Sequence, residues 1–134
     1  MRSKSKPVKL GVNRAGDFTD GVIPYPTWQD VEREIRALDG EQQDQVFIGF
    51  DDERYLGVCG GNGGYYVTSA MTPQGEYALA DPSRPADRTV LVMNGQTCEY
   101  VLSHTTDLAT ALAAARWYYD HEGELAPTLK WEKY

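Results

Sequence analysis

Turn-forming residues divide the apolar stretch of residues 47–71 into three runs, and this pattern constrains the fold more than any other part of the chain. The first break is Asp51-Asp52-Glu53-Arg54, and the second is the glycine-rich run of residues 60–64. Aspartate, asparagine and glycine favour chain reversals, glycine because it tolerates positive φ at little steric cost. Three short apolar runs joined by such turns predict three sequential antiparallel strands, a meander.

An amphipathic helix is predicted before the meander, over residues 27–38. Thr27 can cap its first turn, and Asp30 stands three residues later, as in a capping box. Apolar residues recur on one face at the helical period: Trp28, Val31, Ile35 and Leu38. Gly40 is a natural stop after the last turn.

The start of the chain is polar and basic. Residues 1–6 predict a disordered tail. Residues 7–12 predict a short strand at a sheet edge, because Pro7 cannot donate a backbone hydrogen bond, and residues 22–26 predict an extended segment. We expect residues 1–134 to form a single domain, since a chain of this length can bury a real core.

Further strands follow the meander. Residues 76–80 predict a fourth strand, and residues 81–87 predict a proline-rich loop. Residues 89–93 and 97–102 predict a hairpin around Asn94-Gly95, the strongest short turn signal in the chain.

A second helix is predicted to begin after a cap at Thr105 or Thr106 and to end at Gly123. Its apolar positions at helical spacing are Leu108, Ala111, Leu112, Ala115 and Tyr119. Residues 125–131 predict a last edge strand. The element order predicts an α+β fold, an antiparallel meander sheet of about five to seven strands with two main helices packed on one face.

The charge limits the classes of partner. The net charge is −7, and the first nine residues hold four of the 13 basic residues and no acid. The remainder carries nine basic against 20 acidic residues, so it should repel nucleic acid and membrane surfaces and attract a basic protein. Acidic composition also serves solubility alone. No apolar run approaches a membrane span and no signal peptide is recognisable, which favours the cytoplasm.

The candidate enzyme chemistries lack their signatures. The glycine run of residues 60–64 has no Gly-Lys-Ser/Thr ending and precedes a strand pattern, which favours a wide hairpin turn over a phosphate loop. Cys59 and His104 are a conceivable nucleophile and base, but a free cysteine is commonly a small buried hydrophobe. With His121 as the second histidine, the sequence offers no regular metal-ligand pattern. We therefore expect neither cofactor nor metal.

Adjacent tyrosines predict exposed aromatic surface. Tyr65 and Tyr66 fall in a strand, where neighbours point to opposite faces. Tyr118 and Tyr119 fall in the second helix, and we expect that at most one of them can face the core. Exposed tyrosine beside acidic loops is typical of a protein interface.

Several short motifs stand in an order that resembles a known family. In order they are Leu56-Gly57-Val58, the glycine run of residues 60–64, Tyr65-Tyr66-Val67, Tyr77-Ala78-Leu79-Ala80-Asp81 before a proline-rich turn, Val90 to Met93 before Gly95, the alanine-rich residues 108–115, and Pro127 with Trp131-Glu132 at the end. Over residues 47–131 this order is similar to the first-numbered immunity protein family of bacterial polymorphic toxin systems.

The resemblance implies a non-enzymatic inhibitor that binds a cognate toxin domain, a basic nucleic-acid deaminase, and blocks its active site. Acidic and aromatic turn residues are the predicted toxin-facing surface: first Asp51, Asp52, Glu53, Tyr55, Asn62 and Tyr65, then Asp81 and Asp87. Trp131 is predicted to seal a sheet edge. Two alternatives stay open: a generic acidic binding module that uses a sheet edge or exposed aromatics, and a small enzyme built on Cys59 or a histidine.

Overall fold

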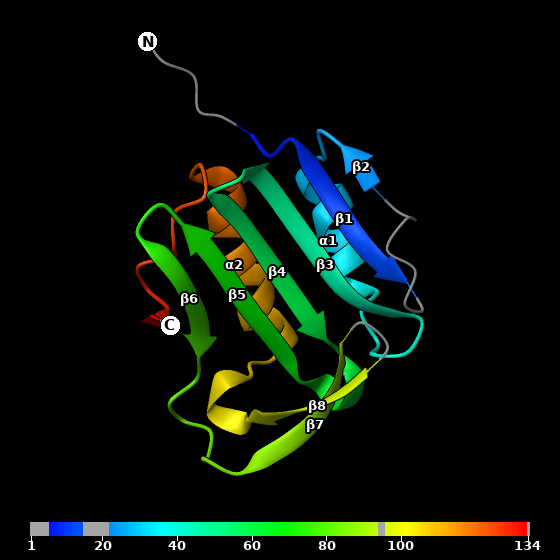
Figure 1. The fold of residues 1–134 in the computed structure, drawn as a ribbon, viewed down its shortest axis with the longest axis vertical. Coiled ribbons are helices and arrows are strands. Elements are labelled where there is room, and N and C mark those ends of the chain that lie inside the picture. The colour runs from blue at the N-terminus through cyan, green and yellow to red at the C-terminus, as the bar shows by residue number, and fades with distance from the viewer. Residues whose placement is uncertain (1–5, 15–21, 94–95, 134) are drawn as a thin grey trace.

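A seven-stranded antiparallel sheet forms the body of the protein. The computed structural model describes residues 6–14, 22–93 and 96–133. The strand order is β2-β1-β3-β4-β5-β6-β9, and both α-helices pack on one face of the sheet (Figure 1). The predicted α+β fold, with an antiparallel meander sheet and two helices, is confirmed.

The predicted meander is the centre of this sheet, and its strands pair in sequence order. The strands of the large sheet are β1 (Lys9–Arg14), β2 (Val22–Pro24), β3 (Gln43–Asp51), β4 (Arg54–Gly60), β5 (Tyr66–Thr72), β6 (Gly75–Ala80) and β9 (Lys130–Lys133). Strand β9 pairs with β6 at one edge, as predicted for the end of the chain. There Trp131 packs against the core and donates its Nε1–H to the carbonyl of Ala126 at 3.2 Å.

The predicted edge position of the first strand is wrong. Strand β1 lies inside the sheet, between β2 and β3. Pro7 precedes the strand, so its missing N–H removes no bond from the ladder. The edge is formed by β2, which lies within the segment predicted to be extended.

The core lies between the sheet and the helices. Alternate residues of the central strands, such as Ile48 in β3 and Leu56 in β4, are fully buried and pair across the ladder. Helix α1 (Trp28–Arg36) adds Val31 and Ile35 from its apolar face. Fully burying side chains of this size contributes roughly 1.5–3 kcal/mol each.

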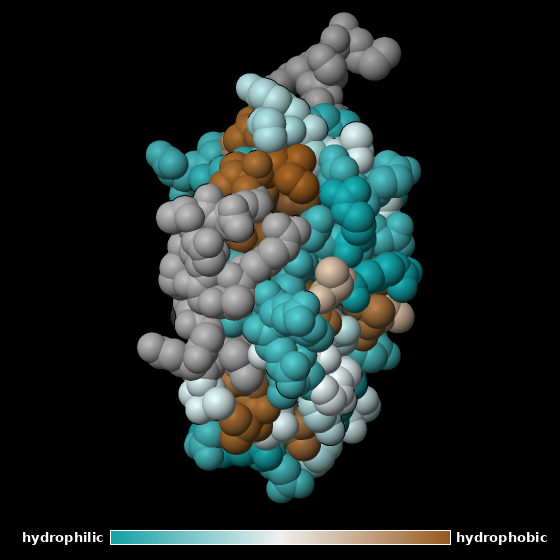
Figure 2. All heavy atoms as spheres, turned by 90° about the vertical axis from the view of Figure 1, so that its right-hand side faces the viewer, coloured by the Kyte–Doolittle hydropathy of each residue, from teal (hydrophilic) through white to brown (hydrophobic). Residues whose placement is uncertain are grey.

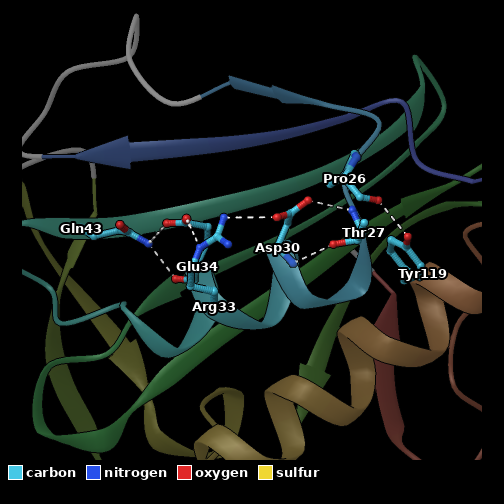
Figure 3. A network of polar contacts seen from close by, with 7 residues as sticks. All are labelled: Pro26, Thr27, Asp30, Arg33, Glu34, Gln43 and Tyr119. Atoms are coloured by element: carbon cyan, nitrogen blue, oxygen red, sulfur yellow. Dashed lines mark hydrogen bonds and ion pairs between the residues drawn. The ribbon is translucent and has the colours of Figure 1, made fainter.

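Helix α1 begins as its sequence predicts. Thr27 Oγ1 accepts the Asp30 N–H at 3.2 Å, and the Asp30 carboxylate accepts the Thr27 N–H at 2.9 Å. This is a complete capping box (Figure 3). The helix ends with Ala37 as its C-cap, while Gly40 takes φ 77° in the loop beyond.

Helix α2 (Leu108–Asp120) begins one or two residues later than predicted. Its N-cap is Asp107, whose carboxylate accepts the Thr110 N–H at 2.8 Å. The predicted cap Thr106 instead exchanges two backbone hydrogen bonds with Tyr66, at 2.8 and 3.0 Å. That bridge holds Thr106 in extended backbone, so the helix starts only after it.

The expectation that Tyr118 and Tyr119 cannot both face the core is wrong, since both are buried. Tyr118 packs edge-on against Phe50 of the sheet, with ring centroids 5.7 Å apart. Tyr119 packs edge-on against Trp28 of α1, with centroids 5.9 Å apart. Because α2 touches the sheet on one side and α1 on another, two adjacent helical positions are both covered.

The hairpin predicted near residue 95 forms a separate two-stranded sheet of β7 (Arg88–Met93) and β8 (Gln96–Val101). Its turn, Asn94-Gly95, lies outside the described residues. The pair lies at the end of the large sheet where β4 ends (Figure 1), and Leu91 of β7 is buried there. Short 3₁₀ turns, Asn62–Gly64 (η1) and Leu102–His104 (η2), precede β5 and follow β8.

Candidate functional site

The sheet face opposite the helices carries glycines on neighbouring strands, on either side of Phe47. Phe47 of β3 pairs with Gly11 of β1 on one side and with Gly57 of β4 on the other. A Cβ atom built on Gly11 or Gly57 would lie 3.6 or 3.4 Å from the Phe47 ring. The ring therefore lies between two positions that have no side chains.

A hollow of about 360 Å³ lies on this face. Its walls hold the exposed side chains of Val22 and Tyr55, which are 60% and 40% exposed. The lining residues are Lys9, Gly11, Val22, Phe47, Gly49, Asp51, Asp52 and Tyr55. The hollow thus brings together three predicted site residues, Asp51, Asp52 and Tyr55, and joins apolar walls to an acidic end.

The acidic turn between β3 and β4 is held in one conformation by Arg54. The guanidinium donates to the Asp51 carboxylate through Nε at 2.9 Å and lies 2.8 Å from it through Nη2. Its Nη1 donates to the carbonyl of Glu122 at 2.7 Å, and it lies over the Phe50 ring. The hydrogen bond from Arg54, with a second one from the Glu53 N–H, holds the pKa of Asp51 below its usual range.

Asp51 therefore stabilises the turn, whereas the charged side chains of Asp52 and Glu53 point outward. Both side chains are exposed. Within the described ranges, neither carboxylate has an ion-pair partner closer than 4.0 Å. A cationic group on a partner would meet these two carboxylates first.

Asn62 and Tyr65 lie at the far end of β4 and β5 from the acidic turn. The Asn62 side chain is wedged beside Gly40, and its Nδ2 lies 3.4 Å from the carbonyl of Val90. Tyr65 is half-buried beneath the Arg84 guanidinium, 5.4 Å from its ring centroid. The structure does not bring these two residues to the hollow.

Asp81 and Asp87 lie on the loop between β6 and β7. The Asp81 carboxylate accepts hydrogen bonds from Ser83, which lower its pKa, and pairs with Arg84 at 3.4 Å. Asp87 is exposed, and its carbonyl accepts the Leu102 N–H at 2.7 Å. Both belong to the β7–β8 end of the molecule rather than to the hollow.

The cysteine and the two histidines that the sequence offers as a nucleophile and bases each have other surroundings or contacts. Cys59 is buried, and desolvation raises its pKa to about 12, so the thiol stays protonated at neutral pH. His104 lies 2.6 Å from the Glu132 carboxylate of β9, and His121 stacks on Trp117. In the described part of the chain, no three His, Cys, Asp or Glu side chains gather as metal ligands would.

The sequence reasoning missed Lys9, Val22, and Phe47 with the glycines on either side of it. A signal was present, because Gly49 and Gly57 interrupt strand patterns at outward-facing positions, and glycine inside a strand marks close approach. The pairing of Gly11 with Phe47 does not follow from the sequence, because Pro7 predicts that β1 lies at an edge.

Comparison with known proteins gives a match over nearly all of these elements. The family model described as immunity protein Imm1 matches residues 19–133, which covers every element from β2 to β9. No curated protein matches the chain. Neither helix in the described ranges is long and apolar enough to cross a membrane.

Proposed function

Because the chain belongs to the Imm1 family of immunity proteins, we propose that it binds a cognate bacterial toxin and neutralises it by occluding the toxin's active site. The family match is the observation that carries the proposal. The proposed mode is stoichiometric binding without catalysis. The protonated, buried Cys59 and the engaged histidines support a role that needs no reactive group.

The surface proposed to face the toxin is the hollow with the acidic turn at its end. Exposed tyrosine and aliphatic side chains supply apolar contact, and Asp52 and Glu53 supply charge beside them. Arg54 fixes the turn before binding, so less conformational entropy is lost when a partner docks.

The proposed partner is a basic toxin domain that acts on nucleic acid, a deaminase in the cytoplasm of the producing cell. A net charge of −7 complements a protein that must itself attract a polyanion. Opposite charge accelerates encounter, which suits an inhibitor that must act before the toxin does. The deaminase and the compartment rest on the resemblance of the motifs around residues 56–67, 77–81 and 108–115.

Co-expression with the cognate toxin domain tests the proposal. We expect the chain to restore growth, and the purified protein to abolish toxin activity at about one equivalent. Inhibition that needs no incubation time and leaves the toxin's mass unchanged would separate binding from an enzymatic modification. Growth arrest that persists with both proteins present would contradict the proposal.

A further inference from the structure

Tyr25, which follows β2, has an unusual combination of strain and exposure. Its φ is 46°, in the left-handed region, and its side chain is 77% exposed. Among the described residues, Glu122 is the other non-glycine residue with positive φ, and it follows a helix C-terminus, where that conformation is common. For a bulky residue outside such a position, positive φ is a genuine outlier.

The backbone on both sides of Tyr25 is clamped. The Tyr25 N–H donates to the carbonyl of Val8 at 2.9 Å. The next carbonyl, that of Pro26, accepts the hydroxyl of the buried Tyr119 at 2.8 Å (Figure 3). Thr27 then begins the capping box of α1. The strained conformation is therefore held by Val8 just before β1, by the first turn of α1 and by Tyr119 of α2.

A series of polar contacts connects the first turn of α1 to the central sheet. Asp30 lies 3.3 Å from Arg33, and Arg33 lies 3.2 Å from the buried Glu34. Gln43, the first residue of β3, donates through Nε2 to the Glu34 carbonyl at 2.6 Å (Figure 3). These bonds fix the frame that carries Tyr25, although the tyrosine side chain itself is left in solvent.

Tyr25 also follows strand β2, which contributes Val22 to the proposed toxin-binding surface. Val22 and Val8 are 60% and 42% exposed, and apolar side chains gather on this side of the molecule (Figure 2). Val22 is a wall of the hollow, and Pro24, one residue before Tyr25, pairs with the hollow residue Lys9. Tyr25 therefore directly follows the strand that supplies one wall of the hollow.

We propose that Tyr25 is a pre-organised aromatic anchor that inserts into an apolar pocket of the toxin. This inference rests on the proposed function. Tyrosine supplies a large contact area with few rotatable bonds, and residues of this kind dominate binding energy in protein interfaces. Tyr25 holds a strained conformation in which glycine or asparagine would be relaxed, and residues strained in this way cluster at binding and active sites.

Replacement of Tyr25, followed by measurement of binding to the cognate toxin domain, tests the proposal. We expect Tyr25→Gly to leave the melting temperature unchanged or raised, since glycine relieves the positive φ, and to weaken toxin binding by at least about tenfold. Tyr25→Phe and Tyr25→Trp should bind within about threefold of the wild type. The matched control is Val90→Ser, which removes an exposed apolar side chain from β7 and should bind as the wild type does.

The outcomes separate this inference from the proposed function. Tight binding by Tyr25→Gly, or a loss of folding shared by Tyr25→Gly and Tyr25→Asn, would overturn the anchor alone. A wild-type dimer in sedimentation that becomes monomeric in Tyr25→Gly would also overturn it, because the occupant would be a second copy. Failure of the wild type to bind the toxin at all would refute the proposed function and the anchor with it.

Discussion

Arg54 is the residue that makes the acidic turn a defined surface. One guanidinium engages the Asp51 carboxylate, the carbonyl of Glu122 and the face of Phe50. The planar fork of arginine can satisfy such a set at once, which a lysine ammonium cannot do in the same geometry. Arg54 therefore neutralises the charge of Asp51 within the fold, whereas the Asp52 and Glu53 side chains remain exposed.

At the same scale, we predict that Cys59 is unreactive in the folded protein. Its burial and raised pKa keep the thiolate population very small at neutral pH. Iodoacetamide at neutral pH should label the half-buried Cys98 first and Cys59 only after denaturant is added, as read by peptide mass spectrometry. Rapid labelling of Cys59 in the native state, with loss of toxin inhibition, would instead support a thiol function.

At the scale of elements, local signals predicted those parts whose bonds are local. The capping box at Thr27 and Asp30 and the turn residues of the meander involve neighbours in sequence, and all took their predicted places. The predicted start of α2 was wrong because it depends on the bridge between Tyr66 and Thr106, which joins segments far apart in the sequence. The expectation that Tyr118 and Tyr119 cannot both be buried was wrong because the helical period does not reveal that α1 lies beside α2.

The candidate site was predictable in part for the same reason. Asp51, Asp52 and Tyr55 share one turn and reached one hollow together. Lys9 and Val22 come from β1 and β2, and only the order of strands in the sheet places them on the same face as the residues of β3 and β4. Asn62 and Tyr65 stand near Tyr55 in sequence, but β4 carries them to the other end of the sheet.

The cap of α2 gives a prediction with a defined pH dependence. Hydrogen bonds from Thr110 hold the pKa of Asp107 below its usual value. The ionised cap therefore stabilises the fold above the ordinary aspartate pKa of about 4, and this contribution is lost as pH falls through the lower folded-state pKa. Asp107→Ala should lower the free energy of unfolding by about 1 kcal/mol at pH 7 and by less in acid, as measured by urea titration.

Asp120→Ala, at the opposite end of the same helix, is the control for the cap. Its carboxylate pairs with Arg116 at the helix surface, a kind of contact worth at most a few tenths of a kcal/mol. An equal loss in both variants at pH 7, or a loss in Asp107→Ala that did not shrink in acid, would argue against the cap assigned here.

At the scale of the whole molecule, the division of the sheet into two unlike faces organises the protein. One face is buried by α1 and α2 and holds the core. The other carries Gly11, Gly57 and the Phe47 ring, and the acidic turn lies at one end of its hollow. The family match makes the chain an immunity protein, and the proposal above assigns this second face to a basic toxin because the net charge is −7.

The dissociation constant of the complex with the cognate toxin domain, measured for a double charge reversal, tests that assignment most directly. Asp52→Lys with Glu53→Lys should weaken binding at least about tenfold at low salt. Added salt should reduce the ratio of the dissociation constants of variant and wild type, because salt screens exposed charges. Glu41→Lys with Glu99→Lys makes the same change in net charge away from the hollow, at exposed residues before β3 and in β8, and should bind within about threefold of the wild type. Equal weakening by both double variants, or no weakening by the first, would contradict binding through the sheet face opposite the helices and its acidic turn.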